Sequence, residues 1–318
     1  MNDFSSLFAV KIMAFLDYRE ARGYKRETYL SHLMKFDQWC VGKCPGKDML
    51  DRETVHAWID DCTGSGCGTP QKARALRQFG KYLRAVGEDA YVLPDKYAPF
   101  RSRSVPYLFT DSEMTALFKS IDALPPTSRE PYLNEILPVM FRLIYTCGLR
   151  PNEGRELLEE NVSLDTGEIL ITHTKRNKER VVVMSDDMLR LARKYSLRRE
   201  IFAGSSLYFF PSAYGGALKT ETVYSAFNRA WSHANLPVKK ARRVRVYDLR
   251  HRFASACLNR WLDNGENLMA MLPFLREYMG HKDLAETAYY IHILPENIIK
   301  SSAIDWNKFN SMFPEVSE

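Results

Sequence analysis

Four short segments of the chain carry residue types that could act together chemically. They are residues 147–153, 174–180, 247–254 and 279–290. Arginine binds phosphate oxygens in a bidentate fashion and stays charged at any working pH, and a tyrosine hydroxyl can act as a nucleophile once it is activated. Each segment alone has an ordinary structural explanation, such as a helix start, a solvated hairpin tip or a helix C-cap. Their combination is therefore more informative than any single motif.

The four segments read Cys-Gly-Leu-Arg-Pro-Asn-Glu, Thr-Lys-Arg-Asn-Lys-Glu-Arg, Tyr-Asp-Leu-Arg-His-Arg-Phe-Ala and Met-Gly-His, the last followed nine residues later by a tyrosine. In type, order and spacing they resemble the tyrosine recombinase (phage integrase) family. That family shows Gly-Leu-Arg-x-x-Glu, a lysine on a β-hairpin, His-x-Leu-Arg-His, Leu-Gly-His and a tyrosine nine residues further on. The resemblance is good over about residues 107–290 and looser before them. The matching residues are Arg150, Glu153, Lys175, Tyr247, Arg250, His281 and Tyr290.

The resemblance implies a metal-independent strand transfer on DNA. Tyr290 would attack the scissile phosphate and leave a 3′-phosphotyrosyl bond and a free 5′-hydroxyl. Negative charge develops on the non-bridging oxygens in the transition state, and by resemblance Arg150 and Arg250 would clamp them. No metal or other cofactor is expected, because the arginines supply the positive charge.

The resemblance also assigns supporting roles. Lys175, on a hairpin, would protonate the leaving 5′-oxygen as the general acid. His281 would hydrogen-bond a non-bridging oxygen, and Glu153 would orient the arginine cluster.

Two departures from the family pattern stand in these segments. Tyr247 takes the place of the usual histidine, and a phenol with a pKa near 10 is a poorer general base than an imidazole. The group that accepts the proton of Tyr290 is therefore left open. Met279 replaces the usual leucine, which is a conservative packing change. Tyr289 and Tyr290 point about 100° apart on a helix, and the spacing from His281 selects Tyr290 as the nucleophile.

Apolar periodicity predicts a mainly α protein with a small antiparallel β-sheet. The strand signals are residues 168–174 and 180–184, and Thr110 to Glu113 matches a capping box. With the resemblance, we expect an N-terminal helical core-DNA-binding (SAM-like) domain at 1–88, a proline-containing linker at 89–107, and a catalytic domain with a C-terminal helical tail at 108–318.

Several basic residues are expected to contact DNA phosphates, with a merely solvated basic surface as the alternative. One group lies on a helix after Thr69, opposite an apolar face. The others flank Lys175 and precede Tyr247. The expected DNA-contacting residues are Arg74, Arg77, Lys81, Arg84, Arg176, Lys178, Lys239, Lys240, Arg242 and Arg243.

Composition agrees with this interpretation without demanding it. The 318 residues carry a formal charge of +6, which is compatible with a polyanionic partner. No apolar run approaches the roughly 18 residues of a membrane span, and the N-terminus lacks the features of a signal peptide. We expect a cytoplasmic protein. The pairs Cys40/Cys44 and Cys62/Cys67 have loose spacing for zinc, so reduced thiols are the favoured interpretation.

The sequence thus predicts a site-specific recombinase, serving a mobile element or chromosome-dimer resolution. Its partners would be double-stranded DNA and three further copies of itself, since recombination joins two DNA sites. The apolar C-terminal segment is expected to help this tetramer form. Two alternatives remain: a type IB topoisomerase-like enzyme that acts as a monomer, and a catalytically silent DNA-binding regulator of the same fold.

Overall fold

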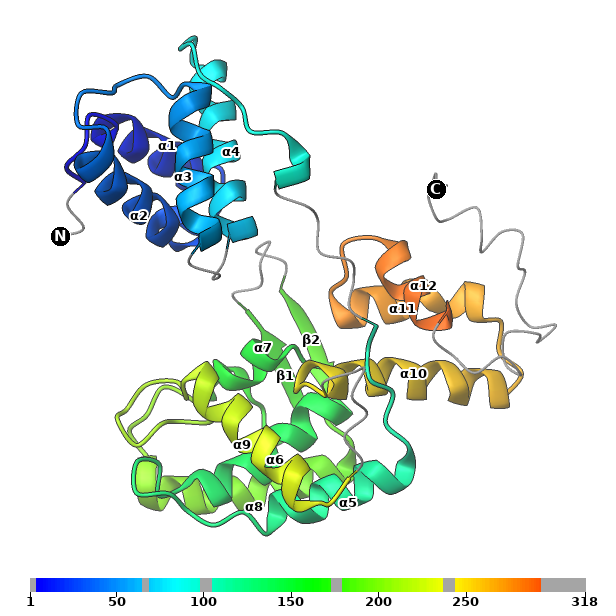
Figure 1. The fold of residues 1–318 in the computed structure, drawn as a ribbon. Coiled ribbons are helices and arrows are strands. Elements are labelled where there is room, and N and C mark those ends of the chain that lie inside the picture. The colour runs from blue at the N-terminus through cyan, green and yellow to red at the C-terminus, as the bar shows by residue number, and fades with distance from the viewer. Residues whose placement is uncertain (1–3, 65–68, 98–104, 173–178, 237–243, 293–318) are drawn as a thin grey trace. The chain divides into compact units, whose positions relative to one another are not determined.

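The structure, a computed structural model, describes residues 4–64, 69–97, 105–172, 179–236 and 244–292. The chain divides into two compact units, Met1–Ser104 and Val105–Glu318. Each has its own hydrophobic core. Figure 1 shows the helices of the first unit in blue and cyan, and those of the second from green to orange.

The first unit is built from four α-helices around an aromatic core. α4 contacts the other three helices. Phe8, Phe15, Phe36 and Phe79 are almost fully buried and pack against one another. The elements are α1 (Ala9–Ala21), α2 (Glu27–Lys43), α3 (Arg52–Gly64), α4 (Thr69–Ala85) and the 3-10 helix η1 (Asp95–Tyr97).

The stretch after α4 packs onto the first unit. Ala90 and Leu93 are buried in its core, and the Tyr91 N–H donates to the Leu50 carbonyl at 2.7 Å. Gly80 on α4 permits this approach, because a Cβ there would lie 2.7 Å from the Tyr91 carbonyl oxygen. Part of the stretch interpreted as linker is thus fixed to the first unit.

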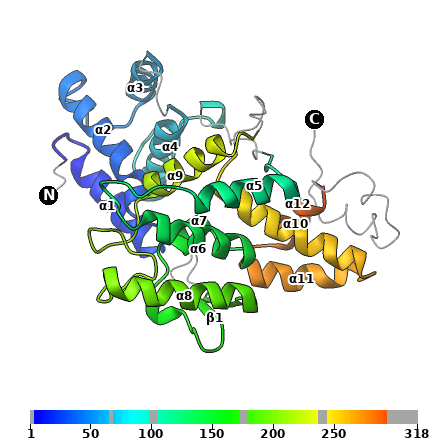
Figure 2. The same ribbon diagram turned by 90° about the horizontal axis from the view of Figure 1, so that it is seen from below.

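The second unit is mainly helical, and one two-stranded sheet lies among its described residues. α6 is its central helix and contacts α5, α8 and α10 (Figure 2). The elements are α5 (Asp111–Asp122), α6 (Leu133–Thr146), α7 (Pro151–Arg155), the 3-10 helix η2 (Glu159–Asn161), β1 (Glu168–Ile171), β2 (Arg180–Val183), α8 (Asp186–Ala203), α9 (Thr220–His233), α10 (Tyr247–Asp263), α11 (Leu268–Met279) and α12 (Leu284–His292).

The predicted fold class, mainly α with a small antiparallel sheet, is confirmed. β1 and β2 pair antiparallel in the register Glu168 to Val183. The capping box also forms: the Glu113 N–H donates to Thr110 Oγ1 at 3.2 Å, and the Thr110 N–H donates to Glu113 Oε2 at 2.8 Å. This cap fixes the start of α5, the first helix of the second unit.

The last three described helices form a subsidiary core of their own. Leu258 of α10, Leu272 of α11 and Ala288 of α12 are all fully buried in it. Figure 1 shows α11 and α12 beside α10. This packing brings α12 to the same side of α10 as the end of α11, so that residues from all three helices can meet. Along the described ranges, no helix combines the length and apolarity needed to cross a membrane.

Candidate active site

A tight turn between α6 and α7 presents Arg150. Gly148 has φ +61°, and a Cβ there would lie 2.5 Å from the Phe253 ring, so both conformation and space require glycine. Arg150 then adopts an extended conformation at the N-cap of α7, and Pro151 begins the helix. The Arg150 N–H donates to Glu153 Oε2 at 2.8 Å. Local sequence therefore fixes the backbone from which the Arg150 side chain projects.

Glu153 joins three arginine side chains. Its carboxylate accepts from Arg150 Nη1 at 2.7 Å and from Arg180 Nη2 and Nη1 at 2.7 and 3.1 Å, and Arg250 Nη1 lies 3.8 Å away. Burial disfavours the charged carboxylate, yet the hydrogen bond and charge of Arg180, with the charges of Arg250 and Arg150, lower the pKa of Glu153 to about 2. Glu153 is thus an anion that holds the cluster together.

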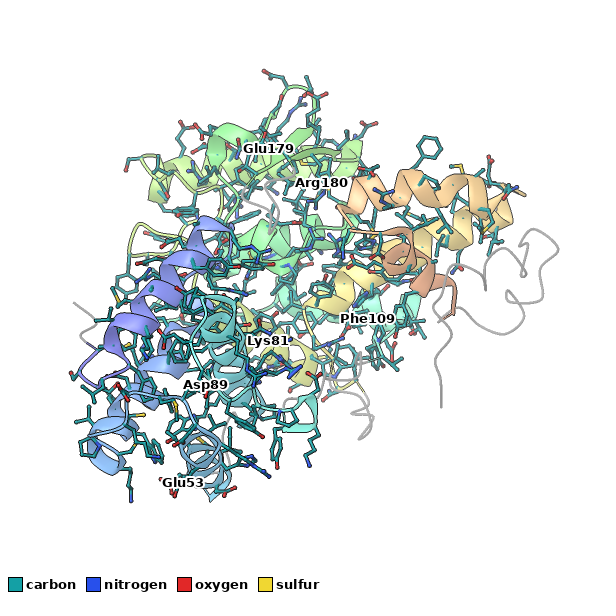
Figure 3. The ribbon with its side chains drawn as sticks, turned by 90° about the horizontal axis from the view of Figure 1, so that it is seen from above. Glu53, Lys81, Asp89, Phe109, Glu179 and Arg180 are labelled. Carbon is teal, nitrogen blue, oxygen red and sulfur yellow. The ribbon has the colours of Figure 1, made fainter. Side chains whose placement is uncertain are left out.

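Arg180 is a site residue that the sequence motifs did not indicate. Its side chain is only 8% exposed and forms a bidentate pair with Glu153. A signal was available, because Arg180 is two residues before Val182 on β2 and alternation places both on the buried face of the strand. Figure 3 labels Arg180 on the side of the second unit where α11 lies. It supports Glu153 and, through Glu153, Arg150.

Three successive main-chain carbonyls at the end of α11 each accept a hydrogen bond from one of these arginines. The last carbonyls of a helix lack intrahelical partners and lie at the negative end of the helix dipole, so cationic donors stabilise them. The cluster is therefore fixed to the turn that carries the next site residue. The pairs are Arg180 Nε to Tyr278 O at 2.8 Å, Arg250 Nη2 to Met279 O at 2.6 Å, and Arg150 Nη2 to Gly280 O at 2.7 Å.

Arg250 projects from the first turn of α10 and is completely buried. Its Nη1 donates to the Gly148 carbonyl at 2.7 Å. This bond ties α10 to the turn that presents Arg150, so the two arginines lie in one cluster although 100 positions separate them in the sequence. Burial lowers the pKa of Arg250, and the cluster keeps a high density of positive charge.

Gly280 ends α11 in the left-handed conformation, with φ +62°, and His281 follows directly. His281 is 8% exposed, and its Nδ1 lies 2.8 Å from Thr287 Oγ1. Burial, with the charges of Arg250 and Arg150, lowers the pKa of His281 to about 2. The ring is therefore held neutral and oriented by Thr287.

Tyr290 lies on α12 and points into this cluster. Its residue is 3% exposed, its ring stacks on His281 with centroids 5.9 Å apart, and its hydroxyl lies 2.9 Å from His251 Nδ1. Burial raises the pKa of the Tyr290 hydroxyl, and the charge of Arg250 opposes that rise. Tyr289 is only half-buried.

Tyr247 opens α10 beside the same group. Its ring lies 5.0 Å from that of His251, centroid to centroid, and its side chain lies near Arg150. The next residue, Asp248, is fully buried and accepts from the Arg245 N–H at 2.8 Å. The structure thus brings together six of the seven predicted site residues. The seventh, Lys175, lies outside the described residues.

The basic face expected on α4 is partly engaged within its own unit. Arg77 donates to the Leu93 carbonyl at 2.7 Å and pairs with Asp95 at 2.7 Å. Arg84 donates to the Ala90 carbonyl at 2.7 Å. These two arginines therefore hold the stretch after α4 in place, a structural role that differs from the predicted contact with DNA.

The remaining predicted DNA contacts divide into two groups. Lys81, labelled in Figure 3, is exposed, and Arg74 is half-buried. The others, like Cys67 of the cysteine group, lie outside the described residues. Within the described ranges, no three His, Cys, Asp or Glu side chains are placed to share a metal ion. The predicted contacts outside the described residues are Arg176, Lys178, Lys239, Lys240, Arg242 and Arg243.

Comparison with known proteins shows which family the chain resembles. The phage integrase family model matches residues 109–297. The integrase/recombinase y4rE of Sinorhizobium fredii is 25% identical over 92% of this chain and 93% of its own length. The tyrosine recombinase XerD of Rhizobium meliloti is 26% identical over 94% of each chain. A lambda integrase tetramer bound to a Holliday junction is similar in fold, with a TM-score of 0.60 at 15% identity over 88% of this chain and 76% of that one.

Proposed function

Because this chain belongs to the phage integrase family, we propose that it cuts and rejoins DNA strands at specific sites through a 3′-phosphotyrosyl intermediate formed by Tyr290. The observation that carries the proposal is the convergence of the buried Tyr290 hydroxyl with Arg150, Arg250 and His281 in one cluster. A buried phenol beside two guanidinium groups is a nucleophile next to an anion-binding site.

The proposed first step is an in-line displacement at phosphorus. The Tyr290 oxygen forms a bond to phosphorus while the bond from phosphorus to the 5′-oxygen breaks. Arg150 and Arg250 stabilise the non-bridging oxygens, and His281 donates to one of them from Nε2, because its Nδ1 is engaged with Thr287. Lys175 gives a proton to the leaving 5′-oxygen. The reverse reaction with another strand's 5′-hydroxyl rejoins DNA without ATP.

Joining two DNA sites needs four active sites, so we propose a homotetramer on DNA. The lambda integrase structure, a tetramer bound to a Holliday junction, supports this assembly through its similar fold, and the C-terminal segment is the proposed contact between copies. The names of the full-length relatives, integrase/recombinase and tyrosine recombinase, favour recombination over simple relaxation of supercoils. We further propose that the recombinase acts either for a mobile element or in the resolution of chromosome dimers.

Covalent trapping tests this function. The full chain is incubated with duplexes that have a randomised centre and a nick within it, so that a cleaved strand diffuses away and the adduct persists. We expect wild type to form adducts whose DNA shares a sequence, and Tyr290→Phe to form none. Tyr289→Phe is the matched control and should trap DNA near the wild-type rate. Adducts formed by Tyr290→Phe, or none formed by wild type, would refute the proposal.

A further inference from the structure

The attack by Tyr290 requires an acceptor for its hydroxyl proton. Tyr247 stands where the resemblance places a histidine, and a phenol with a pKa near 10 accepts a proton poorly at neutral pH. Another group must take the proton.

His251 is placed to do so. It lies four residues after Tyr247 on α10, so both side chains share one face of the helix. Its Nδ1 is 2.9 Å from the Tyr290 hydroxyl oxygen, and the two rings meet at a tilt of 52° with centroids 5.3 Å apart. A general base must be within about 2.6 to 3.2 Å of the atom it deprotonates, and this contact satisfies that requirement before DNA binds.

His281, the other imidazole near Tyr290, is less suited. Its Nδ1 is engaged with Thr287 at 2.8 Å. Its ring is nearly parallel to that of Tyr290, at 16° with centroids 5.9 Å apart, whereas the recorded hydrogen bond of the Tyr290 hydroxyl is to His251. His281 is therefore placed to hydrogen-bond the phosphate, and His251 is placed to accept the proton of the Tyr290 phenol.

Resting on the function proposed above, we propose that His251 is the general base of this site. It accepts the proton of Tyr290 in place of Tyr247, which lies one helical turn away. As the Tyr290 oxygen bonds to phosphorus, its proton passes to His251 Nδ1 and the phosphorus bond to the 5′-oxygen breaks. That oxygen takes a proton from Lys175. In rejoining, His251 returns the proton to the Tyr290 oxygen as its bond to phosphorus breaks, and Lys175 recovers its own from the attacking 5′-hydroxyl.

The surroundings keep the His251 imidazole unprotonated while no DNA is bound. Burial, then the charges of Arg245 and Arg250, lower its pKa to about 3, so the ring is neutral at working pH but is a weak base. Within the described part of the chain, the titratable groups that also face it include Tyr247 on its own helix, and His281 and Tyr290 from the α11–α12 side. A bound phosphate adds negative charge between these cations, which raises the proton affinity of His251 when transfer is due.

The decisive variant is His251→Asn in the full chain, because an asparagine amide can occupy the place of Nδ1 and accept a hydrogen bond without taking a proton. The substrate is a single duplex sequence, chosen because wild type forms covalent adducts with it when offered the pool of nicked duplexes with a randomised centre. We expect adduct formation to slow by roughly 10²- to 10⁴-fold, the usual contribution of a general base. His233→Gln, at an exposed position at the end of α9, is the matched control and should react normally.

Two further readouts separate proton acceptance from positioning. The wild-type rate should vary little from about pH 6 to 9, whereas the His251→Asn rate should rise about tenfold per pH unit as hydroxide replaces the base. A fluorinated tyrosine at position 290, whose phenol is more acidic, should restore much of the His251→Asn rate. A substrate with sulfur in place of the bridging 5′-oxygen should not restore it, because only the departing group becomes easier to release.

The outcomes are distinct. A His251→Asn rate equal to wild type would overturn the inference and leave the proposed function standing. A slow variant with a flat pH profile and no gain from fluorotyrosine would also overturn it, since His251 would then only position Tyr290. If wild type forms no adduct with any duplex in the pool, the proposed function fails, and this inference with it.

Discussion

Replacing Glu153 with glutamine removes the anion shared by the arginine cluster while keeping the shape of the side chain. The pKa of Glu153 falls from its usual 4.5 to about 2, and at about 1.4 kcal/mol per pKa unit the charged form stabilises the fold by about 3 kcal/mol. Removing one partner of a buried ion pair by mutation typically costs about 3 to 5 kcal/mol of stability, which agrees with the value from the pKa shift. Both values apply because the Glu153 side chain is only 9% exposed.

The contribution of Glu153 to the stability of the fold should depend on pH in one direction. A carboxylate whose pKa is lower in the folded protein than in the unfolded chain stabilises the folded state. Its contribution is complete above the pKa of the unfolded chain and is lost as the pH falls through the pKa of the folded protein. The difference between wild type and Glu153→Gln should therefore be constant above about pH 5 and shrink between 4.5 and about 2. Above pH 5, the three guanidinium groups remain uncompensated in the variant.

Calorimetric unfolding of the full chain is the assay, and hydrogen exchange of peptides from α7 and α11 assigns the transition to the second unit. We expect a melting temperature lower by about 6 to 12 °C for a unit of this size. Glu156→Gln is the matched control: Glu156 is the C-cap of the same helix and pairs with Arg155, and its own side chain is 49% exposed. An ion pair with a solvent-exposed carboxylate contributes at most about 1 kcal/mol. Equal stability of the two variants would refute the reasoning.

Two further predictions concern the residues beside this cluster. Gly148→Ala should destabilise the second unit by about 2 to 4 kcal/mol in denaturant titration, because it combines a left-handed φ with a clash against Phe253. Gly215 has φ +85° and open space around it, so Gly215→Ala should lose only the stability that the left-handed conformation costs an alanine. If Gly148→Ala and Gly215→Ala lose the same stability, the clash with Phe253 is disproved. Lys175→Ala should slow adduct formation by roughly 10²- to 10⁴-fold, and a substrate with a bridging 5′-sulfur should remove the defect, since a thiol with a pKa near 8.5 leaves without a proton. A defect that persists with sulfur would exclude Lys175 as the general acid.

Local sequence alone determined much of this protein. The capping box at Thr110 starts α5 as predicted, and the alternation after Gly167 forms the expected antiparallel pair of strands. The capping box joins residues three positions apart, and the strands pair residues 9 to 15 positions apart. Over such short separations, residue type and period are sufficient. The family resemblance likewise followed from short motifs in a fixed order, and the comparison with known families confirmed it.

Other features depended on tertiary packing. Arg180 meets the Tyr278 carbonyl across 98 positions of sequence, and His251 meets Tyr290 across 39. Periodicity says which face of a helix or strand a side chain occupies, but not which distant element packs against that face. For this reason the sequence predicted Tyr290 as the nucleophile and left its proton acceptor open. The packing of α12 against α10 decided which side chain lies beside the Tyr290 hydroxyl, and it placed the imidazole of His251 there.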